Sequence, residues 1–336
     1  MKNGRVSGVC THISECSQNQ FEATDSFIYT KCDSDDFLII CCPTKFSSVN
    51  SISDRFENTR ISEQKCKEYS AAIYVNSVFL PLSVGAPSII TKKEQCAHKI
   101  QPLVVGGEEA RLHEFPHMAL LGYVESNNKV SWDCDFYISR SDLKIVRLGE
   151  LNYESTEDGA EPIDFGISKT FVHPKYDNPP DSSYNDIGIL KLSGKVKLTP
   201  GVRPACLPTS AELSERSIAT GWGQTLFAGS PSSHLLKTVL EKFTKKECKA
   251  VFKAGSINLP NGIDDSQFCV GHRTEIKDTC NGDSGGPLQN YHSSLKCMYT
   301  LYGITSTGQG CGIIGVPGLY IQIWNYIDWI ENIVWS

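Results

Sequence analysis

The stretch K-D-T-C-N-G-D-S-G-G-P-L at residues 277–288 places a serine between glycines. A serine hydroxyl is a poor nucleophile unless a base takes its proton and donors receive the charge that forms on the attacked carbonyl. Gly282 and Gly285 allow a tight backbone path that other residues resist, so the N–H groups of Gly282 and Ser284 can point at one spot. We therefore predict an oxyanion hole beside Ser284, in preference to a glycine-rich surface turn.

The chain of 336 residues is long enough for one large domain and a small one, and its 40% hydrophobic content is ordinary for a globular protein. Its net charge of -6 comes from 38 acidic and 32 basic residues without a strong block of either sign. This charge disfavours a nucleic-acid partner. No stretch is apolar enough to predict a membrane span.

The 14 cysteines favour a secreted, disulfide-bonded protein over a cytosolic one. Metal binding is the alternative, but the sequence has no C-x-x-C pair and no histidines interleaved with cysteines. The residues after Met1 lack the apolar region of a signal peptide. We therefore expect an extracellular protein whose true beginning, including its signal peptide, is absent from this sequence.

The twelve residues around Ser284 resemble the active-serine motif of the chymotrypsin/trypsin-like serine endopeptidases, and the resemblance covers about two thirds of the chain. Short alternating strands beyond Val104 predict an all-β structure. The resemblance implies a trypsin-like domain at 104–336 with two six-stranded antiparallel β-barrels. The spacing of the apolar residues between 326 and 335 predicts a C-terminal helix.

Residues 1–45 hold five cysteines in a segment too small for a hydrophobic core, which indicates a disulfide-stapled module. Its patterns G-V-C-x-x-I-x-x-C and I-I-C-C-P resemble the CLIP domain that precedes the protease in arthropod cascade enzymes. That family has six bridged cysteines, so the resemblance implies an N-terminally truncated CLIP domain. The implied pairs are Cys10–Cys32 and Cys16–Cys42, which leaves Cys41 without a partner.

Residues 46–103 are rich in Ser, Asn, Lys and Thr, and we interpret them as a linker and activation segment. In the protease family, cleavage before a stretch such as V-V-G-G frees an ammonium that pairs with the aspartate preceding the catalytic serine. Here these residues are Val104 and Asp283. A buried ion pair is costly unless both partners are present, so the uncleaved chain is expected to be a zymogen. The bond to be cut follows Leu103, so the activating protease must accept leucine.

Asp186, in Y-N-D-I-G-I-L-K-L, matches the family's triad carboxylate, which orients the base and stabilises its cation. Asp278 lies six residues before Ser284, where the family places the floor of its specificity pocket. Gly308 and Gly318 match wall positions that stay open for a long side chain. A carboxylate in such a pocket favours cleavage after Arg or Lys. The alternatives are a turn aspartate at 186 and a solvated loop acid at 278.

The resemblance also implies disulfides within the protease region. Ser217 stands where the usual partner of Cys297 would be, and Cys66 is the other remaining cysteine. Counting therefore predicts a Cys66–Cys297 bridge. The pairs implied by the resemblance are Cys96–Cys206, Cys248–Cys269 and Cys280–Cys311.

The histidine of the family's triad is missing. The family carries it in a T-A-A-H-C stretch after C-G-G-S-L-I-S, whereas here W-D-C runs straight into D-F-Y-I-S-R-S-D-L-K, and residues 134–148 contain no histidine. We interpret the eight histidines of the chain as surface or structural residues. Loss of the base costs on the order of 10⁶ in turnover, so we predict no useful peptidase activity. The missing part also supplies strand to the first barrel, whose closure needs every strand.

Two hypotheses follow. In the first, this is a secreted CLIP-domain zymogen that cuts proteins after Arg or Lys in an extracellular immune or developmental cascade, and the sequence has lost segments. In the second, it is a non-catalytic homologue that binds proteases or their substrates as a regulatory cofactor. We favour the first because Ser284, Asp186 and Asp278 are retained, and because only Cys41 and Cys134 are left without partners. The implied partners are a protein substrate, an upstream activating protease and serpin-type inhibitors.

No cofactor is expected. The loop at 150–161, E-L-N-Y-E-S-T-E-D-G-A-E, is acidic where some relatives hold calcium. We favour a solvated acidic loop, with a calcium site as the alternative.

Overall fold

The computed structural model describes the chain in segments. Side chains are described for residues 59–71, 73, 108–127, 129–133, 142–176, 181–224, 229–275, 279–310 and 312–336. Four further strands are described by their backbone, namely β1 (Gly8–His12), β2 (Ile39–Pro43), β3 (Tyr74–Phe79) and β4 (Ile89–Glu94). β1 pairs antiparallel with β2, and β3 with β4. The chain divides into two compact units, Met1–Thr59 and Arg60–Ser336.

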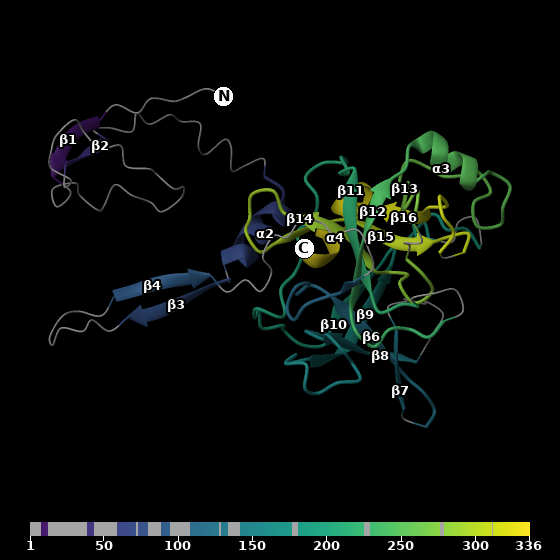
Figure 1. Ribbon diagram of the computed structural model, residues 1–336, viewed down its shortest axis with the longest axis horizontal. Coiled ribbons are helices and arrows are strands. Elements are labelled where there is room, and N and C mark those ends of the chain that lie inside the picture. Colours follow the sequence, from purple (N-terminus) through teal and green to yellow (C-terminus); the bar gives the residue numbers. More distant parts are fainter. Residues whose placement is uncertain are drawn as a thin grey trace. The chain divides into compact units, whose positions relative to one another are not determined.

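The C-terminal half of the protease region forms a closed six-stranded barrel, drawn in green to yellow in Figure 1. Its core includes Ala219, Leu240, Val270, Leu288 and Tyr320, which come from five different strands. The short strand β5 (Glu108–Glu109) pairs antiparallel with β12 (Leu236–Lys242) at the edge of this barrel. The strands pair in the order β11 (Arg216–Gly221), β14 (Pro287–Tyr291), β15 (Tyr299–Thr307), β16 (Gly318–Gln322), β13 (Gln267–Gly271) and β12 (Leu236–Lys242), and β12 pairs back to β11.

The other half forms a five-stranded antiparallel sheet, drawn in teal in Figure 1. Its two edge strands, β10 (Gly188–Leu192) and β7 (Val130–Asp133), do not pair with each other within the described part of the chain. In the sequence, nine residues (134–142) separate β7 from β8 (Leu143–Leu148). The predicted trypsin-like all-β fold is confirmed, with five described strands in this half. They pair in the order β10 (Gly188–Leu192), β9 (Ile163–Val172), β8 (Leu143–Leu148), β6 (Ala119–Val124) and β7 (Val130–Asp133).

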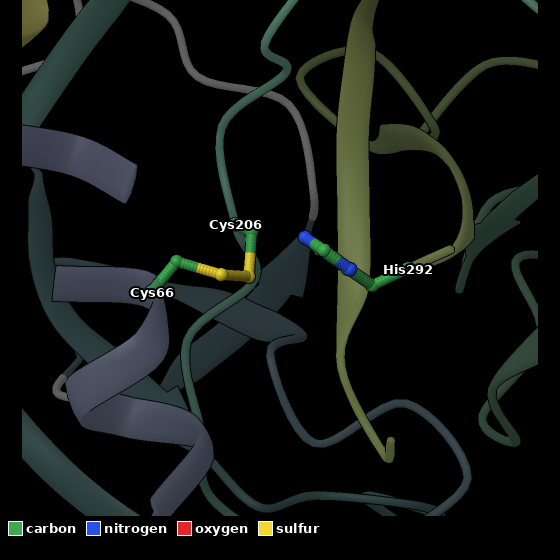
Figure 2. Close-up of side chains that lie close together, drawn as sticks. All are labelled: Cys66, Cys206 and His292. Carbon is green, nitrogen blue, oxygen red and sulfur yellow. A yellow bond between two sulfur atoms is a disulfide. The ribbon is translucent and has the colours of Figure 1, made fainter. Parts of the chain in front are cut away.

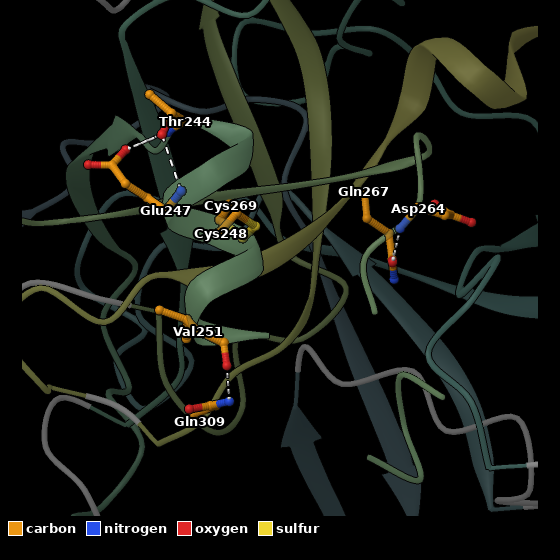
Figure 3. The surroundings of a disulfide bond; sticks show 8 residues. All are labelled: Thr244, Glu247, Cys248, Val251, Asp264, Gln267, Cys269 and Gln309. Atoms are coloured by element: carbon orange, nitrogen blue, oxygen red, sulfur yellow. Dashed lines mark hydrogen bonds between the residues drawn. A yellow bond between two sulfur atoms is a disulfide. The ribbon is translucent and has the colours of Figure 1, made fainter. Parts of the chain in front are cut away.

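Helices pack on the barrel at two places. The predicted C-terminal helix is confirmed as η2 (Ile323–Tyr326) followed by α4 (Ile327–Val334). The helix α3 (Lys245–Val251) begins with a capping box, in which Thr244 and Glu247 satisfy each other's backbone N–H groups. A disulfide joins Cys248 of α3 to Cys269 of β13, the pairing that the resemblance implies (Figure 3).

The helix α2 (Ile61–Ala71) belongs to the same compact unit as the protease region. A disulfide joins its Cys66 to Cys206, with 5.2 Å between the two Cα atoms (Figure 2). The predicted pairs Cys96–Cys206 and Cys66–Cys297 are therefore wrong. The physical reason is that α2 packs its buried face against the Cys206 segment, a contact that counting cysteines does not reveal. Cys297 is also disulfide-bonded.

Polar contacts hold the start of α2 against α4. The guanidinium of Arg60 donates to Glu331 Oε1 over 3.3 Å and also pairs with Asp328. The Ser62 N–H donates to Glu331 Oε1 over 3.1 Å, and the Ser62 hydroxyl donates to the same oxygen. Burial acts to raise the pKa of Glu331, but the hydrogen bonds from Ser62 and Arg60 together outweigh it. The pKa of Glu331 therefore lies below its ordinary value.

We predict that the contact between α2 and α4 weakens in acid. Because the pKa of Glu331 is lower in the folded chain, its contribution is fully present above the unfolded pKa of about 4.3 and is lost as the pH falls through the folded value. A Glu331→Gln variant should lose about 1 kcal/mol of unfolding free energy at pH 7 and much less at pH 3. Urea unfolding at the two pH values measures this. Glu157→Gln, at an exposed acid elsewhere, is the control, and an equal loss at both pH values would contradict the prediction.

Candidate functional site

Ser284 and Asp186 line one cavity of about 380 Å³. Asp186 lies just before β10, an edge strand of the five-stranded sheet, and Ser284 lies in the turn before β14 of the barrel. The fold therefore brings together two predicted side chains from its two halves. Most of the remaining wall is apolar and includes Leu121, Val146, Leu148, Leu190, Leu192 and Ile304.

Ser306 holds the carboxylate of Asp186 in place. Its hydroxyl donates to Asp186 Oδ2 over 2.7 Å. The residue before it, Thr305, is bonded to the serine turn through its backbone, because Gly285 N donates to Thr305 O over 2.8 Å and Thr305 N donates to Gly286 O over 2.9 Å. Sequence reasoning missed Ser306. Its position two residues before Gly308, a predicted pocket residue, was the available signal.

Burial raises the pKa of Asp186, and the hydrogen bond from Ser306 opposes this to a smaller extent. In the part of the chain that is described, Ser306 provides the hydrogen bond to this carboxylate, and no ion pair includes Asp186. A buried carboxylate without a cation is costly. The charge of Asp186 is therefore only partly compensated.

The backbone around Ser284 leaves two N–H groups available. Gly282 and Gly285 have φ values of +88° and +81°, which glycine adopts without strain. The N–H groups of Asp283, Gly285 and Gly286 donate to backbone carbonyls. Those of Gly282 and Ser284 have no hydrogen-bond acceptor among the described residues. These two N–H groups are the ones predicted to form the oxyanion hole.

Asp283 is buried, and two backbone N–H groups hold its carboxylate. Gly223 N donates to Oδ1 and Cys280 N to Oδ2, each over 2.9 Å. Glycine at 223 gives the carboxylate room, because a Cβ there would lie 2.5 Å from Asp283 Cγ. The predicted activation residues Leu103 and Val104 lie outside the described residues, so their pairing with Asp283 stays a prediction.

Two of the predicted pocket residues, Gly308 and Gly318, lie at one end of two paired strands. Gly308 follows β15 and Gly318 begins β16, and these strands pair with Thr307 opposite Leu319. A Cβ on Gly308 would meet only Gly310 O, at 4.0 Å, so the space beside it is open. Asp278 and Cys311 lie outside the described residues, and Cys280 is disulfide-bonded.

Comparison with known proteins adds to this geometry. The family model "Trypsin" matches residues 104–330. The chain belongs to the trypsin family. Serine protease snk of Drosophila melanogaster is 34% identical over 318 residues, which covers 89% of this chain and 69% of that protein. CLIP domain-containing serine protease B4 of Anopheles gambiae is 33% identical over 302 residues, 81% of each chain. Phenoloxidase-activating factor 1 of Holotrichia diomphalia is 31% identical over 269 residues, 70% of this chain and 72% of that one.

No described histidine supplies the base that a trypsin-family protease uses. The histidines whose side chains are described have other neighbours, and none is bonded to Asp186 or Ser284. His113 packs against Gly201, His117 bonds to Gln289, His173 packs on the rings of Tyr326 and Trp329, His234 bonds to Ala110 O, and His272 and His292 accept backbone N–H groups of their own turns.

The acidic loop at 150–161 has protein partners for its most buried acid. Arg147 Nη1 donates to Glu150 Oε2 over 3.2 Å, while Arg147 also forms a two-pronged contact with Asp164 at 2.7 and 2.9 Å. The guanidinium of Arg147 additionally stacks over the ring of Trp132, 4.1 Å from its centroid. The loop is therefore held by a side-chain cation.

Among the residues that the structure describes, one group of side chains is close enough to share a metal ion. It consists of Cys66, Cys206 and His292 (Figure 2). The two cysteines form the disulfide already described, whereas a cysteine binds a metal ion only as a thiolate. We therefore assign no metal to this group. Within the described segments, no helix is long and apolar enough to span a bilayer.

We predict that Asp186→Asn stabilises the protein at neutral pH. The pKa of Asp186 is raised in the folded chain, so stability falls as the pH rises from the unfolded value of about 3.9 through the folded value. The amide removes this cost, and the expected gain is about 1 kcal/mol at pH 7 and near zero at pH 3. Thermal unfolding measures it. Ser306→Ala, which removes a bond to the ionised form, should be less stable at pH 7, and a destabilised Asp186→Asn variant would refute the argument.

A second variant tests the acidic loop. Arg147→Met should lose about 2–3 kcal/mol of unfolding free energy, because the side chain of Glu150 is 3% exposed and would lose its cation. Lys144→Met, at an exposed position of the same strand, should change stability by less than about 0.5 kcal/mol. Urea unfolding of both variants measures the difference, and similar losses would argue against the role of Arg147.

Proposed function

We propose that the protein is a secreted zymogen of the trypsin family that cuts protein substrates after Arg or Lys in an extracellular immune or developmental cascade. Cleavage after Leu103 activates it by freeing the Val104 ammonium for Asp283. The sequence as it stands lacks the general base, so the cut protein binds such substrates without hydrolysing them at protease rates. The observation that carries this proposal is the shared cavity of Ser284 and Asp186, with no described histidine bonded to either.

The site supplies a nucleophile, the Ser284 hydroxyl, but no described general base to activate it. The Ser284 hydroxyl has no hydrogen-bond partner among the described residues, so nothing described accepts its proton. The N–H groups of Gly282 and Ser284 remain able to stabilise an oxyanion. In a well-studied serine protease, oxyanion stabilisation and substrate binding alone accelerate hydrolysis by roughly 10³–10⁴-fold over the reaction in water. Removal of its histidine lowers the turnover rate by about 10⁶-fold.

The substrate preference rests on Asp278, Gly308 and Gly318. An open wall at Gly308 leaves room for a long side chain, and a carboxylate at the pocket floor would bind its charged end. The activating protease is a different enzyme, because a pocket that prefers basic side chains does not accept Leu103. The cascade is inferred from relatives, one of which is named a phenoloxidase-activating factor.

A non-catalytic homologue is the second candidate function. The absence of histidine from residues 134–148, and the fact that only nine residues separate β7 from β8 in the sequence, favour it. Such a protein would hold proteases or their substrates through the same pocket and would act as a regulatory cofactor. Sequencing the transcript across residues 134–142 discriminates the two candidates, because a message that still lacks the histidine leaves the second standing.

We predict that the protein cut after Leu103 binds p-aminobenzamidine, a fluorescent mimic of an arginine side chain, but turns over an Arg reporter peptide on the order of 10⁶-fold more slowly than an intact relative. Asp278→Ser should abolish binding of the mimic, and Glu275→Gln, at a nearby exposed acid, should not. Fluorescence titration and reporter hydrolysis measure the two properties. Turnover at ordinary protease rates would contradict the claim that the chain lacks a general base. Failure to bind the mimic would contradict the proposed preference for Arg or Lys.

A further inference from the structure

The cavity between Asp186 and Ser284 has the make-up of a small-molecule site. Its volume of about 380 Å³ falls within the roughly 300–1,000 Å³ of typical ligand pockets, which are mostly apolar with a few placed polar groups. Leu121 of β6, Val146 of β8 and Leu190 of β10 supply apolar wall. Asp186 and Ser284 supply the polar groups.

Both polar groups have unused hydrogen-bonding capacity. Ser306 bonds to Oδ2 of Asp186, and no described residue bonds to Oδ1. The hydroxyl of Ser284 has a proton to donate and no described acceptor. A ligand that matches both must donate an N–H to a carboxylate and accept a proton from a hydroxyl. A neutral imidazole ring does both, through its two nitrogens.

We propose that this cavity binds an imidazole ring, supplied either by free imidazole or by a histidine side chain of a bound polypeptide, and that the ring serves as the base that the chain lacks. The inference rests on the proposed function in taking Ser284 as the nucleophile of a chain that is cut after Leu103 and recognises Arg. The apolar wall suits the neutral ring, because desolvation disfavours the charged form, and the neutral ring is the form that can accept a proton.

The step balances without another reactant. The imidazole nitrogen takes the Ser284 proton while Oγ bonds to the substrate carbonyl carbon, and the resulting oxyanion faces the N–H groups of Gly282 and Ser284. The imidazolium, beside Asp186, then gives that proton to the leaving nitrogen as the C–N bond breaks. In the second half, water loses a proton to the ring and attacks the acyl carbon, and the ring returns a proton to Oγ as the ester bond breaks.

The first arm of the test uses free imidazole. The full chain, cut after Leu103, is given an Arg reporter peptide without histidine and increasing imidazole. Hydrolysis should rise about 10²-fold and saturate, because general-base catalysis contributes roughly 10²–10⁴-fold. Pyrazole, a ring of similar shape and far weaker basicity, should give no increase. Ser284→Ala should abolish the effect.

The second arm uses a histidine carried by the substrate. A reporter with histidine beside the Arg should be cut without added imidazole, and the same peptide with alanine there should not. If only the histidine-containing peptide is cut faster, the imidazole ring comes from a bound polypeptide. If only added imidazole increases the rate, free imidazole is the ligand. Either result supports the site.

Cavity-filling variants test where the ring binds. Leu121→Phe and Leu190→Phe should each raise the imidazole concentration for half-maximal rate by about tenfold or more, because the larger side chains occupy the cavity. Binding of p-aminobenzamidine, which reports the Asp278 pocket, should be unchanged in both and verifies that the variants fold. We propose two variants so that the test can still be made if one of them does not fold.

Two outcomes would overturn the proposal. One is the absence of acceleration in both arms while p-aminobenzamidine still binds, which leaves the proposed substrate specificity standing. The other is a linear dependence on imidazole that the cavity-filling variants do not alter, which indicates base catalysis from bulk solution. Loss of p-aminobenzamidine binding with acceleration retained would instead contradict the proposed specificity and support the imidazole site.

Discussion

The hydrogen bond from Ser306 to Asp186 joins the two halves of the protease region at the point where chemistry is expected. Asp186 comes from the edge of the five-stranded sheet, and Ser306 belongs to a barrel strand whose neighbouring residue is bonded to the serine turn. This one contact therefore sets where the carboxylate lies relative to Ser284. It also offsets part of the cost of burying a charge, since hydrogen bonds to charged groups are worth more than neutral ones.

The described part of the site holds several polar groups that have no protein partner among the described residues. These groups are a buried carboxylate with one unused oxygen, a hydroxyl and two backbone N–H groups, and leaving such groups unpaired is unfavourable for stability. In a complete trypsin-family site, the imidazole side chain satisfies the first two of these groups. Here Asp186 and Ser284 face a cavity instead.

Much of the fold was predictable from local patterns. Alternating strands, the apolar spacing at the C-terminus and the glycines around Ser284 each express a backbone preference that the barrel retains. The disulfides Cys96–Cys206 and Cys66–Cys297 were predicted wrongly because pairing depends on how α2 packs on the protease unit, which no local pattern encodes. Ser306 was missed for a similar reason, since its partner Asp186 lies 120 residues away.

The bridge between Cys66 and Cys206 spans the position at which activation is expected, because one cysteine precedes residue 103 and the other follows it. Hydrolysis there would yield two polypeptides that dilution cannot separate. Both sulfur-bearing side chains are buried, at 4% and 2% exposure, so a solvent-borne reductant has little access to them. Any surface that captures residues 1–59 would then also immobilise the part of the chain that follows the cut, which could not diffuse away.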